Sequence, residues 1–182
     1  MKKTTIAKAD LLWLDMEMTG LDFERDRVLE VGAIATNWKL EEIARFTAAV
    51  RVSARLMKKR MQGEFWDENS EVRDRLLAQN SSGEPAKAVE ENLIKFLNKY
   101  FDRKQPIIMA GNSIWNDRRF IEKYWPKLYK KLHYRMLDVT AWKLIFENKF
   151  GSKFTKPDAH HAIEDIEGSI AELKQYLVKV KK

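Results

Sequence analysis

The apolar residues in the first third of the chain come in short runs that turn-forming residues separate. One run, Leu11 to Leu14, passes directly into an acidic pair and then into Thr19-Gly20. A continuous apolar run of this length with polar boundaries predicts a strand that is buried on both faces. A second strand is predicted at residues 28–36 and a third at about 42–51, with a turn at residues 37–39. These three strands are predicted to form an antiparallel meander.

Beyond residue 80, strand-like runs alternate with apolar residues at helical spacing. Ser81 to Pro85 is a helix-start signal, because proline is tolerated in the first turn of a helix. Residues 52–82 are polar and irregular, with short helical patches. The later predicted elements are a helix after Pro85, a strand at 106–111, a helix from near Asp117 to Tyr124, a strand at 134–138, a helix through Trp142 and Phe146, a loop at 151–159 and a long helix from about His161.

This order of elements predicts an α/β fold. Three antiparallel strands followed by alternating strands and helices give a mixed five-stranded sheet flanked by helices. No internal repeat, low-complexity segment or linker divides the sequence, and 182 residues are enough for a buried core. We therefore predict a single domain over residues 1–182.

The composition excludes several classes of protein. A hydrophobic content of 45% with 34% charged residues is ordinary for a globular protein. The chain contains no cysteine, which excludes disulfides, a thiol nucleophile and a zinc–thiolate site. Residues 1–8 lack the apolar core of a signal peptide, and no stretch approaches the roughly 20 apolar residues of a membrane span. We therefore expect a cytoplasmic protein with no membrane partner.

The charge points weakly to a polyanionic partner. The formal net charge is +7 and the sequence pI is near 9.5, and nucleic acid is the common partner of such proteins. The positive residues are scattered, however, and are locally dense only at 58–60, 127–135 and 179–182. A lysine-rich tail is more often a solvated chain end than a binding arm.

Two acids follow the first apolar run directly. Asp15 and Glu17 lie two positions apart, so they share one face of the predicted strand. Desolvation and mutual repulsion oppose the ionisation of two buried carboxylates unless cations compensate. A divalent metal ion is one such cation, although either acid in this position also suits a simple turn cap.

Two further acids and a histidine are candidates for the same site. Asp117 lies in the first turn of a predicted helix, where the residues alone indicate a cap. Asp165 lies between Ile163 and Ile166, beside the apolar stripe of the last helix, and an acid there needs a partner. His160 stands just before that helix. A lone histidine is more often structural than catalytic, but its pKa near neutrality allows it to take a proton from water.

Four blocks of sequence, taken in order, carry a family resemblance. They span residues 11–173 and are Leu14-Asp15-Met16-Glu17-Met18-Thr19-Gly20-Leu21-Asp22, then Gly111-Asn112-Ser113-Ile114 with Asp117-Arg118-Arg119-Phe120, then His133-Tyr134-Arg135 with Leu137-Asp138-Val139, then His160-x-Ala162-x-x-Asp165-Ile166. Together they resemble the oligoribonuclease family, in the histidine branch of the DEDD 3′-to-5′ exonuclease superfamily. A single Asp-x-Glu is common, whereas four blocks at family spacing are highly specific.

The resemblance implies a fold and an activity. The fold is ribonuclease H-like, the protein is a homodimer, and the substrate is short single-stranded RNA, cleaved from its 3′ end to nucleoside 5′-monophosphates. His160 is the implied general base, and its rival His161 is one residue short of the family spacing to Asp165. Two divalent cations, Mg²⁺ or Mn²⁺, are held directly or through water by four acids, which are Asp15, Glu17, Asp117 and Asp165.

The resemblance also implies substrate contacts. Leu21 matches a leucine that wedges between two bases, and Trp66 matches a tryptophan of the family. Residues that grip the 5′ phosphate correspond to Ser113, Arg135 and Thr140, where Thr140 replaces a serine. Tyr134 and Arg135 are donated by the other subunit in the family, although from the residues alone they suit an ordinary solvated strand end equally well.

The chain departs from the family in its middle. The family places a phosphate-capping histidine a few residues after the matching tryptophan, whereas this chain has Glu71 near that position and histidines only at 133, 160 and 161. Trp115 also replaces a smaller residue beside Asp117. A carboxylate repels a terminal phosphate. We therefore expect a weaker preference for dinucleotides over slightly longer oligomers than the family implies.

Two rival functions remain open at this stage. A proofreading-type 3′-to-5′ DNA exonuclease uses the same fold and acids, but it leaves His133-Tyr134-Arg135 unexplained. A non-catalytic nucleic-acid-binding module has the fold without the activity. The presence of all five polar residues argues against that second rival, because binding alone does not need them together.

Overall fold

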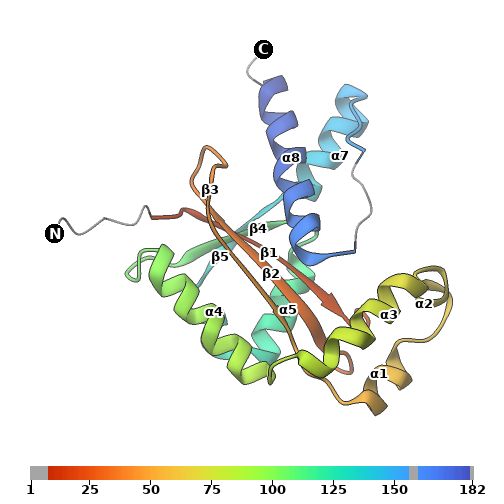
Figure 1. Cartoon of the computed structure of the whole chain (residues 1–182). Helices are drawn as coiled ribbons and strands as arrows, with labels where there is room; N and C mark the ends of the chain where they lie inside the picture. Colours follow the sequence, from red (N-terminus) through yellow and green to blue (C-terminus); the bar gives the residue numbers. More distant parts are fainter. Residues whose placement is uncertain (1–7, 156–159, 181–182) are drawn as a thin grey trace.

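The computed structural model describes residues 8–155 and 160–180, and within them five strands form one sheet in the order β3-β2-β1-β4-β5 (Figure 1). β1 pairs antiparallel with β2, and β2 pairs antiparallel with β3. β4 runs parallel to β1, and β5 runs parallel to β4. The predicted mixed sheet is therefore confirmed. The strands are β1 (Leu11–Met18), β2 (Val28–Thr36), β3 (Glu42–Ala49), β4 (Ile107–Gly111) and β5 (Leu132–Asp138).

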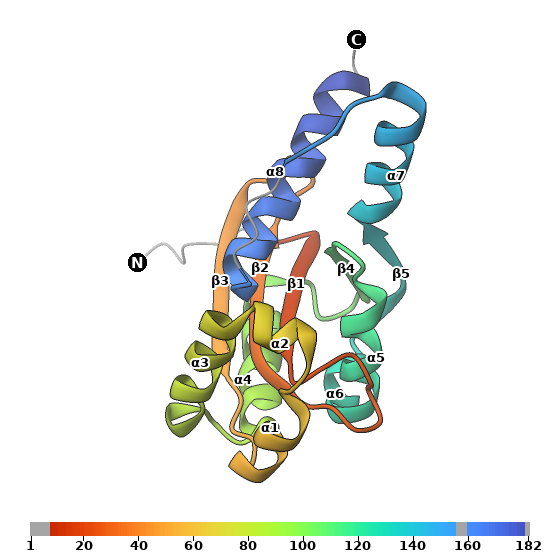
Figure 2. The same ribbon diagram turned by 90° about the vertical axis from the view of Figure 1, so that its right-hand side faces the viewer.

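Helices cover both faces of the sheet. α4, α5 and α6 pack on one face, and α7 and α8 pack on the other. α1, α2 and α3 form a third group beside the lower end of the sheet in Figure 2. The helices are α1 (Ala54–Arg60), α2 (Glu64–Glu68), α3 (Ser70–Gln79), the 3₁₀ turn η1 (Asn80–Ser82), α4 (Ala86–Tyr100), α5 (Trp115–Tyr124), α6 (Pro126–Tyr129), α7 (Val139–Phe150) and α8 (Ala162–Val180).

The alternation of side chains along β1 explains why the site lies on the α8 face. Leu12 and Leu14 point into the core beneath α4 to α6, whereas Leu11 and Trp13 point into the core beneath α7 and α8. Continuing this second face along the strand, positions 15 and 17 are the acids. β1 therefore directs apolar groups towards the body of α8 and carboxylates towards its first turn.

The segment at residues 52–82 is more helical than the sequence predicts. It contains α1, α2, α3 and η1, and α3 alone is ten residues long. Within α3 only Leu76 is fully buried, so the helix lacks a wide apolar stripe. A small third core, formed with Leu29, Met57, Met61 and Trp66, holds this segment against β2 instead. Such a long-range contact leaves no periodic signal in the sequence.

The other boundaries are close to prediction. β3 ends at Ala49 rather than near residue 51, and β5 begins at Leu132, two residues early. The predicted loop at 151–159 is described only as far as residue 155, and the expectations for residues 1–7 and 181–182 also fall outside the described residues. Across residues 8–155 and 160–180, no helix has both the length and the apolar character needed to cross a membrane.

Candidate active site

Three of the predicted carboxylates meet where β1 passes under the first turn of α8. Asp15 and Glu17 come from β1 and Asp165 comes from α8, and one oxygen of each lies within 4.8 Å of the other two. All three side chains are half-buried. Hard divalent cations bind oxygen ligands at about 2.0–2.6 Å, so oxygens this close together fit around one ion.

The electrostatics of the cluster favour a cation. Burial, together with the charges of Asp165 and Glu30, raises the pKa of Glu17 to about 7. His160 and Arg75 act in the opposite direction, but they do not outweigh the other causes. A bound cation stabilises the ionised form of carboxylates in such a place. The donor set therefore fits a divalent metal ion.

Asp117 is a fourth acid near this cluster, although it lies outside the group of three. It is in the first turn of α5, as predicted, and only 5% of it is exposed. The pKa of Asp117 is raised to about 8, mainly by burial and also by the charges of Glu17 and Asp138, although backbone hydrogen bonds from its own N–H and that of Met16 act to lower it. A first-turn acid so deeply buried beside another carboxylate is more than a surface cap.

His160 stands beside the cluster in an unusual backbone conformation. Its φ angle is +46°, in the left-handed region that few residues other than glycine adopt. Its ring lies edge-on to Phe65, with centroids 5.9 Å apart. The next residue, His161, donates its backbone N–H to Asp165 Oδ2 over 3.1 Å. The two histidines therefore differ in role, because the backbone of His161 orients a candidate metal ligand.

A buried network that the sequence analysis missed supports this corner of the site. The Glu30 carboxylate on β2 accepts hydrogen bonds from Arg75 Nη1 at 2.5 Å, Gln79 Nε2 at 2.9 Å and the Ala162 backbone N–H at 3.1 Å. Burial acts to raise the pKa of Glu30, but the hydrogen bonds from Arg75 and Gln79 outweigh it, so the pKa lies below its ordinary value. The only signal in the sequence is an acid inside the apolar run Val28-Leu29-Glu30-Val31.

Ser113 and Thr140, two of the three residues predicted to hold a phosphate, come together near the C-terminal ends of β4 and β5. The backbone N–H of Ser113 donates to Thr140 Oγ1 at 2.9 Å and to Asp138 Oδ1 at 3.1 Å. The hydroxyl oxygens of Ser113 and Thr140 are 3.3 Å apart. Asn112 donates to Ser169 Oγ at 3.0 Å, which fixes this turn against α8.

The other predicted substrate residues are more dispersed. Tyr134 and Arg135 are exposed on the edge strand β5, where the Arg135 guanidinium lies 5.0 Å from the centre of the Tyr134 ring. Glu71 is exposed in the first turn of α3. Trp115 is exposed at the start of α5.

A hollow of about 550 Å³ extends from Glu17 to the exposed side chain of Leu21. Trp66 forms part of its wall, but only 5% of Trp66 is exposed, and its indole N–H donates to the Thr19 carbonyl at 3.3 Å. Phe65, which the sequence analysis did not single out, is 53% exposed and also lines the hollow. The aromatic surface available to a ligand therefore belongs mainly to Phe65, whereas Trp66 supports the wall.

An ion pair holds the turn that carries Leu21. Arg60 of α1 donates to both oxygens of the buried Asp26 carboxylate, at 2.7 and 3.0 Å, and Thr19 Oγ1 donates to the same group at 2.8 Å. Burial acts to raise the pKa of Asp26, but these hydrogen bonds outweigh it and the pKa lies below its ordinary value. A Cβ at Gly20 would lie 2.6 Å from Asp26 Oδ2, so the turn needs glycine there.

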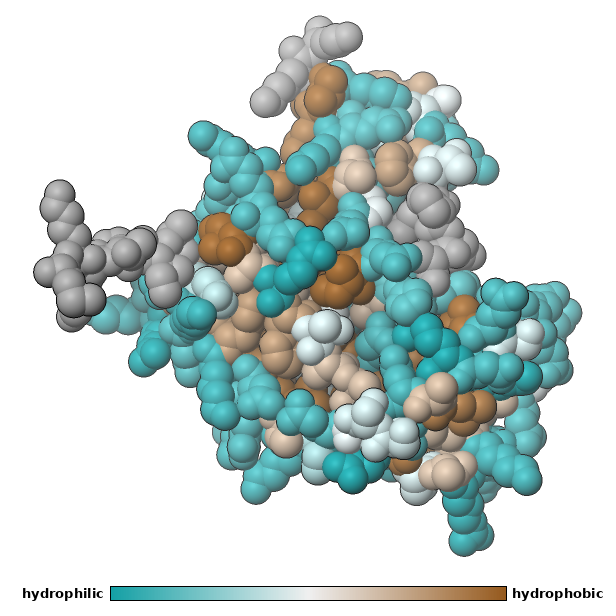
Figure 3. All heavy atoms as spheres, in the orientation of Figure 1, coloured by the Kyte–Doolittle hydropathy of each residue, from teal (hydrophilic) through white to brown (hydrophobic). Residues whose placement is uncertain are grey.

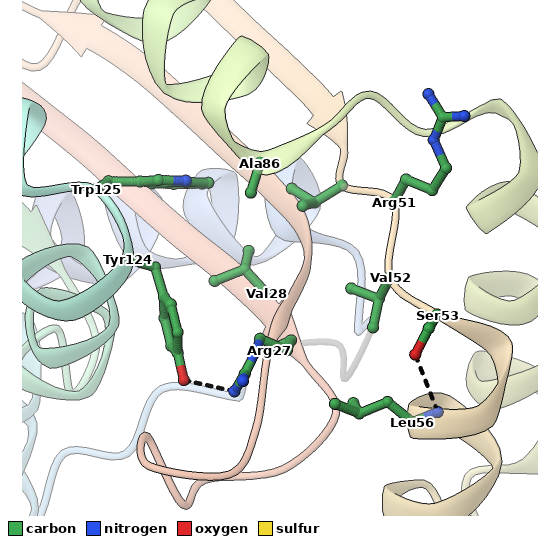
Figure 4. Close-up of a pocket in the computed structure, with 10 residues that line it drawn as sticks. Arg27, Val28, Arg51, Val52, Ser53, Leu56, Ala86, Tyr124 and Trp125 are labelled. Carbon is green, nitrogen blue, oxygen red and sulfur yellow. Dashed lines mark hydrogen bonds between the residues drawn. The ribbon is translucent and has the colours of Figure 1, made fainter.

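A second hollow, of about 320 Å³, lies on the opposite face of the sheet (Figure 4). Its polar groups are mostly engaged within the protein, because Arg27 donates to the Tyr124 hydroxyl at 2.6 Å and Ser53 caps α1 through the Leu56 N–H. The Arg51 side chain points away from the hollow in Figure 4. This site therefore lacks the acidic chemistry of the first.

Comparisons with known proteins identify the family of the chain. A sequence model of the exonuclease family RNase_T matches residues 12–173. The oligoribonuclease of Francisella tularensis subsp. novicida is 37% identical, with 94% of this chain and 96% of that protein covered. The oligoribonuclease of Coxiella burnetii is also 37% identical, with 92% of each chain covered.

Solved structures share the fold at lower identity. An exonuclease I of Methylocaldum szegediense has a TM-score of 0.63 at 14% identity, covering 94% of this chain and 40% of that one. A zinc-bound complex of E. coli ExoI with single-stranded DNA has a TM-score of 0.64 at 14% identity, covering 96% of this chain and 41% of that one. This chain spans about two fifths of those proteins, and the likeness confirms the predicted ribonuclease H-like fold. On the family match and the curated relatives, the chain belongs to the oligoribonuclease family of exonucleases.

Proposed function

We propose that this protein is a metal-dependent 3′-to-5′ exoribonuclease that degrades short single-stranded RNA to nucleoside 5′-monophosphates. Curated relatives named oligoribonuclease cover nearly the whole chain. The observation that carries the proposal is the meeting of Asp15, Glu17 and Asp165 within 4.8 Å beside His160. We also propose that residues 1–182 form a single exonuclease domain. The cytoplasmic location stays a prediction from the sequence.

The acids form the metal-binding part of the proposal. Asp15, Glu17 and Asp165 would hold one divalent cation, and Asp117 would help to hold a second, Mg²⁺ or Mn²⁺ in either case. A bound pair of such ions activates a water molecule and stabilises the departing oxygen of a phosphodiester. The raised pKa values of Glu17 and Asp117 support this assignment, because a group whose charge is costly in the free protein gains most from a cation.

The remaining residues act on the water and on the RNA. His160 would accept the proton of the attacking water, since a neutral imidazole nitrogen can act as a general base. The paired hydroxyls of Ser113 and Thr140 would donate to a phosphate of the substrate. Leu21 and Phe65 would contact the bases along the hollow, with Trp66 behind them.

We propose a homodimer on the basis of an exposed apolar surface on α7 and α8. Single exposed apolar residues are normal, whereas a cluster of them marks an interface. Apolar atoms are visible at the C-terminal end of α8 in Figure 3. β5, which carries the exposed Tyr134 and Arg135, leads directly into α7, so a dimer formed through this surface would bring these two residues towards the other subunit's site. The exposed residues of the surface are Leu144, Ile145, Phe150, Val178 and Val180.

The rival with a specific observation in its favour is a DNA exonuclease. Structural neighbours include E. coli Exonuclease I in complex with single-stranded DNA, but at 13–14% identity this likeness extends to the fold alone. The curated relatives that match the chain at 36–37% identity are named oligoribonuclease. RNA is therefore the substrate we propose.

One experiment separates these functions. Purified protein is incubated with 5′-labelled RNA and DNA oligomers of two and seven residues, with Mn²⁺ or with chelator, alongside the variants Asp165→Ala and Glu164→Ala. Glu164 is an exposed acid in the same helical turn and serves as the matched control. We expect metal-dependent release of mononucleotides from RNA that is lost in Asp165→Ala and kept in Glu164→Ala. Preferential cleavage of DNA, or no cleavage by the unmodified protein, would overturn the proposal.

A further inference from the structure

Arg75 of α3 connects three elements of the fold at the edge of the carboxylate cluster. Its Nη1 donates to Glu30 Oε2 on β2 at 2.5 Å and to Gln79 Oε1 at 3.1 Å. Its Nη2 donates to the backbone carbonyl of His160 at 2.8 Å. One guanidinium group therefore spans β2, α3 and the residue just before the last helix.

The backbone at His160 needs support from outside its own segment. A left-handed φ angle at a residue other than glycine is strained, so surrounding contacts must hold it in place. α8 begins two residues later, at Ala162. The hydrogen bond from Arg75 fixes the His160 carbonyl, and therefore also the orientation of the Cα–Cβ bond that carries the imidazole.

The anchor on the other side of Arg75 is rigid. Glu30 is 8% exposed and also accepts the N–H of Ala162, so its carboxylate holds Arg75 and the start of α8 together. A Cβ at Gly32 on the same strand would lie 2.9 Å from the backbone of Ala162. The first turn of α8 is therefore pressed against β2, which leaves His160 little freedom to shift without breaking these contacts.

From this geometry we propose that Arg75 is a positioning residue for the general base, acting through the His160 backbone. This inference rests on the proposed function. The planar fork of arginine reaches both Glu30 and the His160 carbonyl at once, whereas the single ammonium of lysine cannot reproduce that arrangement. It also connects the base to α3, which contacts α2, the helix that carries Phe65.

The alternative role for Arg75 is electrostatic, because its charge lowers the pKa of Glu17. Arg75→Lys separates the two roles, since it keeps a positive charge and removes the fork. Arg73→Ala is the control for the loss of an arginine from α3, because Arg73 pairs with the exposed acids Asp67 and Asp74 instead.

The test is a double-mutant cycle between Arg75 and His160, measured as kcat and KM on a short RNA with saturating Mn²⁺. We expect Arg75→Ala and Arg75→Lys each to lower kcat by about 10- to 100-fold, as for other supporting contacts of a site, with KM changed far less. In a His160→Ala background, neither change lowers kcat further, because the group that Arg75 positions is absent. Arg73→Ala leaves kcat unchanged in both backgrounds.

A second readout needs neither metal nor substrate. The imidazole signals of His160 in a ¹H–¹⁵N spectrum, assigned by their loss in His160→Ala, shift or broaden in Arg75→Lys and stay in place in Arg73→Ala. Equal losses of kcat in both backgrounds, or unchanged His160 signals in Arg75→Lys, would overturn the positioning role. If His160→Ala retains full activity, the proposed general base is wrong, and that outcome is distinct from a failure of the positioning role.

Discussion

Glu17 and Glu30 face each other across β1 and β2, yet their environments shift their pKa values in opposite directions. Glu30 has its own cation in Arg75 and a hydrogen bond from Gln79, so it is stable as an anion. Burial of Glu17 and the nearby charges of Asp165 and Glu30 raise its pKa to about 7. One glutamate therefore anchors α8, while the other is suited to a bound cation.

The first prediction concerns the carboxylate cluster without its metal. In Asp15→Asn one negative charge is removed from a group whose oxygens lie within 4.8 Å of one another, so repulsion between the remaining acids falls. We expect the melting temperature in chelator not to decrease, whereas the stabilisation by Mn²⁺, about 2.7 kcal/mol at a concentration 100 times the Kd, is largely lost. Calorimetric melting with and without Mn²⁺ measures both effects. A clear fall of the melting temperature in chelator would contradict this account.

The second prediction concerns pH and the Asp26–Arg60 ion pair. The pKa of Asp26 in the folded protein lies below its ordinary value of 3.8, so the pair stabilises the fold above that pH and the contribution is lost as the pH falls through the folded pKa. We expect Asp26→Asn to lower the free energy of unfolding by about 1–3 kcal/mol at pH 7.

This difference should shrink as the pH is lowered below 3.8, because protonation then removes the same charge from the unmodified protein. Urea unfolding of both proteins between pH 7 and pH 3 measures it. Asp22→Asn is the control, because that acid pairs with Arg25 at the surface. A difference that is constant over this range would exclude the ion pair as its cause.

The third prediction tests the apolar surface of α7. Ile145 is exposed there in the single chain, so a charge at this position is tolerated by the fold but costly in an interface. We expect Ile145→Glu to shift the protein from dimer to monomer in sedimentation analysis, with little change in melting temperature at low protein concentration. Trp38→Glu, at an exposed turn between β2 and β3, is the control. An unmodified protein that sediments as a monomer would refute the dimer.

How far the sequence predicts this molecule depends on the kind of signal. β2 occupies residues 28–36 as predicted, because a fully buried strand is a continuous apolar run bounded by turn residues. The shared face of Asp15 and Glu17 is predicted by their spacing of two on a strand, and their proximity to Asp165 is predicted by the family pattern. Without the family pattern, the position of Asp117 in a first turn has an ordinary explanation as a cap, and only that pattern predicts it as a metal ligand.

The residues that the sequence analysis missed act through contacts between distant segments. Arg75 lies 45 residues from Glu30 and 85 from His160, and nothing in its local sequence distinguishes it from the other cations of the chain. Trp66 and Phe65 show a related limit. The aromatic pair is evident in the sequence, but only the burial of one and the exposure of the other assign a supporting role to Trp66 and a contacting role to Phe65.

The fourth prediction follows from that assignment. Phe65→Ala removes exposed aromatic surface from the hollow, and stacking of a base on an aromatic ring contributes about 1–3 kcal/mol. We expect KM for short RNA to increase about tenfold with little change in the melting temperature, since stacking contributes to binding rather than to folding. Trp66→Ala, by contrast, should lower the free energy of unfolding by about 3–5 kcal/mol, as for a buried aromatic residue. Equal effects of the two changes on stability would contradict the assignment.

The fifth prediction concerns substrate length and Glu71. This exposed carboxylate lies in the first turn of α3, near the position where the family has a histidine that caps a phosphate. A dinucleotide has so few phosphates that each lost contact matters, whereas a longer oligomer retains others. We therefore expect the unmodified protein to prefer two-residue RNA over seven-residue RNA only weakly.

In Glu71→His the repulsion is removed, which is a change of about 1 kcal/mol for exposed charges, or about fivefold in kcat/KM. This gain should appear for the dinucleotide and be absent for the seven-residue RNA, because only the short substrate depends on that one contact. Glu68→Gln, which neutralises an exposed acid at the end of α2, is the matched control and should leave the ratio unchanged. Turnover of two-, three- and seven-residue RNA by the three proteins gives the comparison. A steep preference of the unmodified protein for the dinucleotide would show that another residue caps the phosphate.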